Sequence, residues 1–318
     1  MSVVKDDKDD ESSRPDAGEM NVDGIGTSLP ATVVAELARI GPIWKENIPA
    51  HVARMVELFS PLLAGCPKGG VRVSRGLSYG SHARNLLDVF HPAQAQGAAA
   101  VLFVTGGGFV DGERNRSDEI YANVLYYFAR HGIVGINMGY RLAPEAKWPE
   151  GSKDVEAAVD WIRTHAAELG IDSNRIFIIG HSAGAAHAAG FAYGADVPPV
   201  AGLIVISGRV RADNSPENPN AAKVAAYYGT DPSLYDARSP VTLVVPESMP
   251  TLIAVAEYEN PLIDVYCLEL AYRLAKAKRA APPFLQLRGH NHISIVAHFN
   301  SPEDTLGKAI LAFIANPR

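Results

Sequence analysis

Residues 175–193, RIFIIGHSAGAAHAAGFAY, contain the most informative pattern in the chain. An apolar run ends at Gly180, Ser182 follows, and a run of small residues compatible with a helix begins at Ala183. The pentapeptide GHSAG fits G-x-S-x-G, a pattern that arises by chance in a chain of this length about one time in ten. A strand before the serine and a helix after it are the context that a nucleophile elbow requires. We therefore interpret Ser182 as a candidate nucleophile, with an ordinary serine in a tight turn as the alternative.

Short apolar runs alternate with helix-compatible runs from about residue 71 onward. The strand candidates are 71–75, 85–90, 100–104, 133–138, 175–179, 202–206, 251–256 and 284–288. The helix candidates between them are 118–130, 152–169, 183–194, 262–279 and 303–315. Because continuous apolar strands are buried on both faces, this alternation predicts an α/β fold. We expect a central, mostly parallel eight-stranded sheet flanked by helices.

The length and charge of the chain limit its organisation and its partners. The chain has 318 residues, 47% hydrophobic and 20% charged, which is ordinary for a soluble globular protein. Residues 1–23 hold eight acids and three bases, and so most of the net charge of −6. We expect residues 1–28 to be a disordered acidic tail and residues 29–318 to form a single domain. The near-neutral remainder gives no reason to expect nucleic acid or an anionic membrane as a partner.

Cysteine usage and the N-terminal composition predict a cytoplasmic protein. Cys66 and Cys267 are isolated, so we expect buried thiols and neither a disulfide framework nor a metal knuckle. The acidic N-terminus lacks the apolar stretch of a secretory signal. No apolar run reaches the roughly 20 residues that cross a bilayer.

Two segments outside the regular alternation are candidates for a cap. Residues 29–65 carry two runs with helical apolar spacing, separated by prolines. Residues 208–246 are rich in Pro, Asn and Asp, and an excursion of this length between core strands is commonly a lid or binding insert. The aromatic residues of these segments indicate either an apolar substrate group or packing within the cap; they are Trp44, Phe59, Tyr227, Tyr228 and Tyr235.

A triple glycine upstream of the serine is a candidate oxyanion site. It lies in VLFVTGGGFVDGE, residues 101–113, after a strand candidate. A phosphate loop is the alternative, but Glu113 stands where such a loop needs lysine, and Asp111 replaces the third glycine of a dinucleotide motif. Bare backbone N–H groups at successive glycines suit a developing oxyanion better.

The order of three motifs resembles a known family. TGGGF, then YRLAPEAKWPEGSKDVEAAVDWI at 140–162, then GHSAG resemble the α/β-hydrolase superfamily, within it the hormone-sensitive-lipase-like carboxylesterases and the related arylformamidase-like esterases. The resemblance covers roughly residues 85–315 and implies an α/β-hydrolase fold with a helical cap. It also implies that the backbone N–H groups of Gly107, Gly108 and Ala183 form the oxyanion hole. Thr105 replaces the histidine of the family's HGGG loop, which alters the hydrogen bonds behind that hole.

The base and the acid are expected after the serine, because the chain order in this fold is Ser, acid, His. GHNHIS favours His292 as the base, in the family's position after the last strand, with His290 as the alternative. We interpret His187 as a packed helix histidine. A His-x-His metal pair at 290 and 292 is a further alternative, but no third clustered ligand accompanies it.

The acid is expected in AEYENPLIDVY, residues 256–266. Relatives often read AEYDPL with Asp as the triad acid, whereas this chain has Glu259 and one additional residue before Pro261. We favour Glu259, which reaches one methylene further than Asp. Asp264 and Glu257 stay open as alternatives.

These residues predict a serine hydrolase that cleaves carboxylic esters through an acyl-enzyme on Ser182, with His292 as base and Glu259 as acid. An amidase or arylformamidase with the same triad is one alternative. A non-catalytic ligand-binding protein on an esterase fold is another. We expect a small-molecule ester as substrate and no metal or organic cofactor, and a homodimer stays open.

Overall fold

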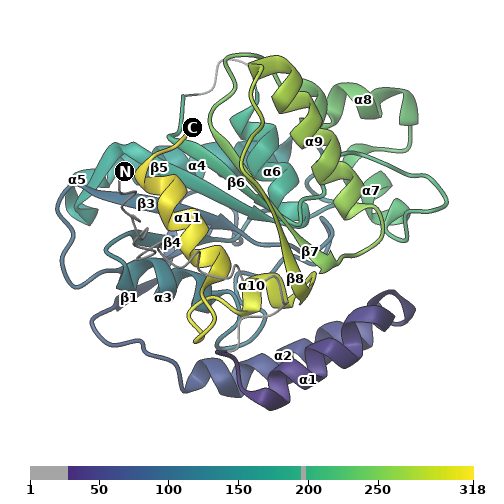
Figure 1. Cartoon of the computed structure of the whole chain (residues 1–318). Coiled ribbons are helices and arrows are strands. Elements are labelled where there is room, and N and C mark those ends of the chain that lie inside the picture. The colour runs from purple at the N-terminus through teal and green to yellow at the C-terminus, as the bar shows by residue number, and fades with distance from the viewer. Residues whose placement is uncertain (1–27, 195–197) are drawn as a thin grey trace, which may run out of the picture.

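An eight-stranded sheet forms the centre of the molecule (Figure 1). The structure is a computed structural model that describes residues 28–194 and 198–318. The strand order is β1-β2-β4-β3-β5-β6-β7-β8. The bounds are β1 Arg72–Ser78, β2 Leu86–His91, β3 Ala98–Val104, β4 Val134–Met138, β5 Ile171–His181, β6 Gly202–Ile206, β7 Thr251–Tyr258 and β8 Phe284–Asn291.

Strand β2 runs antiparallel to both of its neighbours, and all other pairs from β4 to β8 are parallel. The mostly parallel eight-stranded sheet predicted from the sequence is therefore confirmed. The predicted acidic tail, apart from residue 28, lies outside the described residues.

Helices cover both faces of the sheet, and strand β3 shows why. Val101 and Phe103 point into one core, whereas Ala100, Leu102 and Val104 point into the other, as the two-residue period of a strand requires. The first core is covered by α1 Ala31–Ile40, α2 Ile48–Ala64, α3 Ala122–Arg130, α10 Ser294–Ala297 and α11 Thr305–Ala315. The second is covered by α4 Glu150–Thr164, α5 Ala166–Leu169, α6 Ala183–Ala192 and α9 Ile263–Lys278.

Helix α6, which begins directly after Ser182, is buried on nearly every side. Its residues are mostly Ala and Gly, and it packs against β5, β6 and α4. Small side chains allow this close approach to the sheet, and burial all round explains the lack of an amphipathic stripe. The helix thereby fixes the position of the turn that carries the serine.

The segment 208–246 forms a separate small core over the carboxyl ends of the central strands. It contains α7 Ala221–Tyr228, η2 Pro232–Leu234, α8 Tyr235–Arg238 and η3 Pro240–Leu243, at the right of Figure 1. Its aromatic residues Tyr227, Tyr228 and Tyr235 are buried together with Phe109, whose ring stacks on Tyr227 at 4.8 Å. These tyrosines therefore serve packing, and they do not line the pocket described below.

The first two helices and the 3-10 turn between them, η1 Gly41–Glu46, lie at the lower right of Figure 1. Trp44 and Phe59 are fully buried there in the first core, so they too serve packing. The Asn47 side chain caps α2 by accepting a hydrogen bond from Ala50 N at 3.2 Å. No helix among the described residues is long and apolar enough to cross a membrane.

Candidate active site

Ser182 stands on a sharp turn between β5 and α6. Its φ is 55° and its ψ is −123°, a left-handed conformation that a residue with a side chain rarely adopts. The neighbouring backbone passes so closely that a Cβ at Gly180 would strike the backbone of Ala185. A Cβ at Gly184 would lie 2.5 Å from the carbonyl oxygen of Thr105. Glycine is therefore required on both sides of the serine, as the elbow motif predicts.

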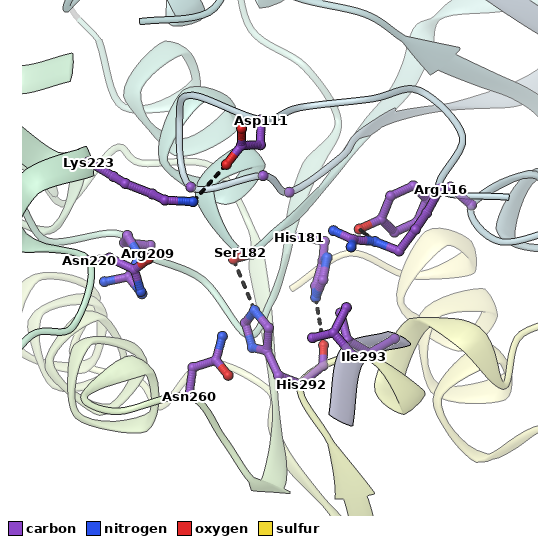
Figure 2. Close-up of a pocket in the computed structure, with 15 residues that line it drawn as sticks. Asp111, Arg116, His181, Ser182, Arg209, Asn220, Lys223, Asn260, His292 and Ile293 are labelled. Atoms are coloured by element: carbon purple, nitrogen blue, oxygen red, sulfur yellow. Dashed lines mark hydrogen bonds and ion pairs between the residues drawn. The ribbon is translucent and has the colours of Figure 1, made fainter. Parts of the chain in front are cut away.

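Three side chains from separate parts of the chain meet at this turn. His292 Nε2 lies 3.0 Å from Ser182 Oγ, the contact drawn in Figure 2, and His292 Nδ1 lies 2.6 Å from Glu259 Oε2. The serine is 8% exposed, and the other two side chains are buried. The serine can lose its proton to the imidazole, and the carboxylate can orient the ring and stabilise its charged form.

Backbone and hydroxyl groups hold the Glu259 carboxylate in place. Its Oε1 accepts a hydrogen bond from Ala256 N at 2.8 Å and a short one from Ser207 Oγ. The other two candidate acids lie elsewhere. Glu257 is exposed and accepts a hydrogen bond from the backbone of β8, and Asp264 accepts one from the adjacent backbone N–H at the start of α9.

The glycine loop after β3 lines the same pocket as Ser182. Gly107 has a φ of 153°, and a Cβ there would lie 2.5 Å from the carbonyl oxygen of Asp111. Within the described ranges, the backbone N–H groups of Gly107, Gly108 and Ala183 have no hydrogen-bond acceptor. They are therefore available to an oxygen atom bound beside the serine.

Thr105 fastens this loop from behind. Its Oγ1 donates to Glu113 O at 2.9 Å, and its own carbonyl oxygen accepts from Tyr140 Oη at 2.8 Å. The threonine thus ties the two ends of the loop together where the family's histidine would stand. The guanidinium of Arg84 also holds the loop, because it donates to the carbonyl oxygen of Gly112.

His181 is a site residue that the sequence analysis missed. Its Nε2 contacts the carbonyl oxygen of His292 at 2.9 Å, and its ring lines the pocket (Figure 2). Burial, aided by the charge of His292, lowers the pKa of His181 well below its ordinary value. A neutral His181 therefore braces the loop of the candidate base. In the sequence, the one indication that His181 belongs to the site is its position next to Ser182 in GHSAG.

The other candidate histidine, His290, points away from the serine. Its Nε2 lies 3.2 Å from Glu303 Oε2, and His298 Nε2 lies 3.6 Å from the same oxygen. Ser294 contacts Nδ1 of both rings, through its hydroxyl for His290 and its carbonyl for His298. We call His290, His298 and Glu303 the rear cluster.

The rear cluster corrects the expectation that no third ligand would accompany His290. Its three ligand atoms lie within 4.8 Å of one another, the one such set among residues 28–194 and 198–318. His292 does not belong to it, so the His-x-His pair itself is not a ligand pair. Apart from their contacts with one another, the three ligand atoms are buried with no hydrogen-bond partner among the described residues, and the cluster does not line the pocket.

His187, on α6, is buried between aromatic rings. Its ring lies 4.7 Å from that of Tyr140 and 5.5 Å from that of Phe109. Burial lowers its pKa to about 3, so it stays neutral. This is the packed helix histidine expected from the sequence.

The pocket in front of Ser182 has a volume of about 230 Å³ and a mostly polar lining. Besides the serine, its histidine and the glycine loop, it is lined by charged and amide side chains. These are Asp111, Arg116, Arg209, Asn220, Lys223 and Asn260. Asn220 and Lys223 come from α7 and Val52 comes from α2, so both predicted cap segments contribute to the lining.

The sequence of this chain matches one family model and is similar to several curated esterases. The family model BD-FAE matches residues 87–199, which include the glycine loop and the serine turn. Esterase LipC from Mycobacterium tuberculosis is 37% identical over 112 residues, 35% of this chain and 27% of that protein. Ethyl acetate hydrolase from Pseudomonas putida is 35% identical over 99 residues, 30% of each chain. The chain thus matches less than a third of the length of these relatives.

Solved structures match over almost the whole chain. A bacterial heroin esterase has a TM-score of 0.68 at 24% identity, covering 92% of this chain and 98% of that one. An esterase from the archaeon Pyrobaculum calidifontis has a TM-score of 0.67 at 21% identity, covering 88% and 96%. At these identities the structural likeness shows the fold alone. The similarity in sequence to esterases comes from the shorter matches, which cover about a third of this chain. The chain therefore has the α/β-hydrolase fold of these esterases, and around the glycine loop and the serine turn its sequence is similar to that of carboxylesterases.

Proposed function

We propose that this protein hydrolyses carboxylic esters through an acyl-enzyme on Ser182. The observation that carries the proposal is the continuous chain of contacts from Ser182 Oγ through His292 to Glu259, at 3.0 Å and 2.6 Å. The same turn faces a pocket lined by the glycine loop. Nucleophile, base and acid are thus arranged as acyl transfer requires.

The reaction begins when Ser182 Oγ attacks the ester carbonyl carbon and His292 Nε2 takes its proton. The negative charge that develops on the carbonyl oxygen is stabilised by the N–H groups of Gly107, Gly108 and Ala183. Glu259 stabilises the imidazolium across Nδ1. The tetrahedral intermediate then collapses, and His292 gives its proton to the departing alkoxide, which leaves as the alcohol.

Water completes the cycle. His292 takes a proton from a water molecule, whose oxygen attacks the acyl carbon of the acyl-enzyme. Collapse of the second tetrahedral intermediate returns the proton to Ser182 Oγ and releases the carboxylic acid. Every proton moves through His292 Nε2, so the step needs no group beyond those described.

The experiment is steady-state hydrolysis of p-nitrophenyl acetate and butyrate by the purified chain. We expect Ser182→Ala to lower kcat by roughly 10⁴-fold or more, because a serine nucleophile and its base act as a unit. Full activity in Ser182→Ala would refute the proposal. A matched N-acyl-p-nitroanilide and N-formyl aniline measure the amidase and arylformamidase alternatives. The non-catalytic alternative predicts no turnover of any of them.

A further inference from the structure

The pocket beside Ser182 carries more positive than negative charge. Arg116, Arg209 and Lys223 line it, against one acidic side chain, Asp111. Figure 2 shows Arg209 and Lys223 on one side of the serine and Arg116 on the other. A pocket that binds a neutral ester does not need an excess of positive charge. We therefore ask which negative or polar group compensates each of the three cationic side chains.

Lys223 is balanced within the protein. Its Nζ lies 2.7 Å from Asp111 Oδ2, and both side chains are substantially exposed, at 41% and 69%. An exposed pair of this kind is screened by solvent and leaves no net charge. It joins α7 to the glycine loop and does not call for a ligand.

Arg116 lies at the solvent-exposed side of the pocket. Its Nε donates to Tyr121 Oη at 3.3 Å, and its guanidinium lies over the same ring at 5.7 Å. No carboxylate among the described residues forms an ion pair with it. Water can solvate this charge, so Arg116 attracts anions toward the pocket without fixing one.

Arg209 is different because it is buried. It is 2% exposed, and its Nη1 donates to a neutral amide, Asn218 Oδ1, at 3.2 Å. No carboxylate in residues 28–194 or 198–318 forms an ion pair with it. Burial lowers the pKa of Arg209 and outweighs the charges of Asp213 and Glu259, which act on it from a distance. The carboxylate of Asp213 accepts hydrogen bonds from Tyr266 and Ser215. Burying an arginine without a partner is costly, and such a charge is normally matched by a carboxylate or phosphate.

The position of Arg209 relative to the serine is fixed. Its backbone N–H donates to Ser182 O at 2.9 Å, and Asn218 supports its side chain while also accepting from Asn220 N at 3.0 Å. The guanidinium is therefore held by the cap segment next to the reacting bond. A fixed fork of donors of this kind binds a carboxylate through two parallel hydrogen bonds.

We propose that the substrate is an ester that carries a carboxylate, and that Arg209 binds this carboxylate on the cap side of Ser182. The inference rests on the proposed esterase function, whose scissile bond it positions. It replaces the apolar substrate group suggested by the tyrosines of the cap segment, since those side chains pack away from the pocket.

The test compares two matched pairs of esters. The first pair, p-nitrophenyl hydrogen adipate and p-nitrophenyl methyl adipate, places the carboxylate on the acyl side. The second pair, 4-acetoxybenzoate and methyl 4-acetoxybenzoate, places it on the alcohol side. We expect kcat/KM for the anionic member of at least one pair to exceed that of its neutral partner by about tenfold or more. This is the size of effect that charge-assisted hydrogen bonds supply.

Arg209→Met is the informative variant. We expect it to lower kcat/KM for the preferred anionic ester by about tenfold to a hundredfold and to change the neutral partner by less than about threefold. The matched control is Arg211→Gln, two residues along, because Arg211 pairs with Glu269 and Asp236 outside the pocket. It should change neither ester.

Two outcomes would overturn the inference. One is wild-type enzyme that cleaves the neutral member of both pairs as well as the anionic member. The other is a folded Arg209→Met variant that loses both members equally. If Arg209→Met does not fold, wild-type hydrolysis of the neutral ester is measured with added adipate and with added adiponitrile, which is neutral and not an ester. Adipate should inhibit and adiponitrile should not, and equal inhibition by the two would overturn the inference.

Failure of the proposed function looks different. Wild type would then cleave none of the four esters, and calorimetric binding of p-nitrophenyl hydrogen adipate and p-nitrophenyl methyl adipate to Ser182→Ala would be compared. Tighter binding of the anion would uphold Arg209 as an anion site in a non-catalytic protein. Equal binding, or none, would refute it.

Discussion

Glu259 Oε2 lies 2.6 Å from His292 Nδ1, and each of the two residues directly follows the end of a different strand. The pairing of β7 with β8 produces this contact, because Tyr258 lies opposite Asn291 in their register. The residues that follow each strand are thus brought together at one edge of the sheet. The irregularity in this pairing after Ala256 lies at the same place. The additional residue before Pro261 is accommodated without moving the carboxylate out of reach.

This contact predicts the effect of replacing Glu259. We expect Glu259→Gln to lower kcat for p-nitrophenyl butyrate by roughly 10²- to 10⁴-fold, because the amide does not stabilise the imidazolium. Glu259→Asp should retain more activity than the amide variant but less than wild type, because its carboxylate is one methylene short. The measurement is steady-state kinetics on folded variants.

The two rival acids provide the matched controls. Asp264→Asn and Glu257→Gln should keep kcat within about threefold of wild type, because neither side chain contacts His292. A large loss in either control, together with little loss in Glu259→Gln, would assign the acid elsewhere.

From the contacts between Arg141 and Asp154 we predict that replacing Asp154 lowers the stability of the protein without lowering its catalytic activity. The buried Asp154 carboxylate accepts from Arg141 N at 2.8 Å and lies 2.7 Å from Arg141 Nη2. Only the carboxylate of this pair is buried, since the Arg141 side chain is 28% exposed, so removing the charge of Asp154 costs about 1–3 kcal/mol. We expect Asp154→Asn to lower Tm by about 3–10 °C, measured by calorimetry, with kcat/KM at 25 °C within about threefold of wild type.

Asp160→Asn, on the exposed side of the same helix, is the control for this variant. Its carboxylate is 60% exposed and lies 3.8 Å from Arg163, so its Tm should stay within about 1–2 °C of wild type. A thermally stable Asp154→Asn variant that had lost its activity would instead place Asp154 in the catalytic machinery.

The rear cluster predicts a specific dependence of stability on pH. Burial raises the pKa of Glu303, but the contact with His290 and the charge of His298 outweigh burial and lower it from 4.5 to about 2. Because the folded pKa lies below the unfolded value, the stabilisation is fully present above about pH 4.5 and is lost as the pH falls toward 2.

Urea unfolding of Glu303→Gln across this pH range tests the prediction. We expect the variant to be less stable than wild type at pH 7 and to show a flatter decline of unfolding free energy between pH 4.5 and 2. Glu217→Gln, at an exposed position, should follow wild type. If the unfolding free energy of Glu303→Gln fell between pH 4.5 and 2 as steeply as that of wild type, the Glu303 carboxylate would not be the cause of this pH dependence.

The sheet and the serine turn were predictable because their signals are local. Each strand is a short apolar run, and the turn needs its glycines within two residues of Ser182. One helix was only partly predicted: the run from 118 begins as a helix at Ala122, because Ser117 Oγ accepts from the N–H groups of Glu119 and Ile120 and holds a turn there. Local side-chain hydrogen bonding competed with the helix.

The acid and the charged pocket were not decidable from the sequence. Three carboxylates lay within eight residues of one another, and the register of β7 against β8 determines which one meets His292. In the sequence, Arg209 is one of several polar residues after β6, and nothing in the pattern marks it as buried. Its burial without an ion pair among the described residues becomes visible only when the segment after it folds back over the serine. Both the choice of the acid and the burial of Arg209 depend on contacts between segments far apart in the sequence, which the periodicity of apolar residues does not reveal.

The most direct test of the central claim is covalent labelling of Ser182. Wild-type protein is treated with a fluorophosphonate, and the modified residue is located by peptide mass spectrometry. The account predicts one phosphonyl adduct, on Ser182, with labelling abolished in Ser182→Ala and slowed by at least about a hundredfold in His292→Ala. An unlabelled wild-type Ser182, or a Ser182→Ala variant that keeps its esterase activity, would contradict it.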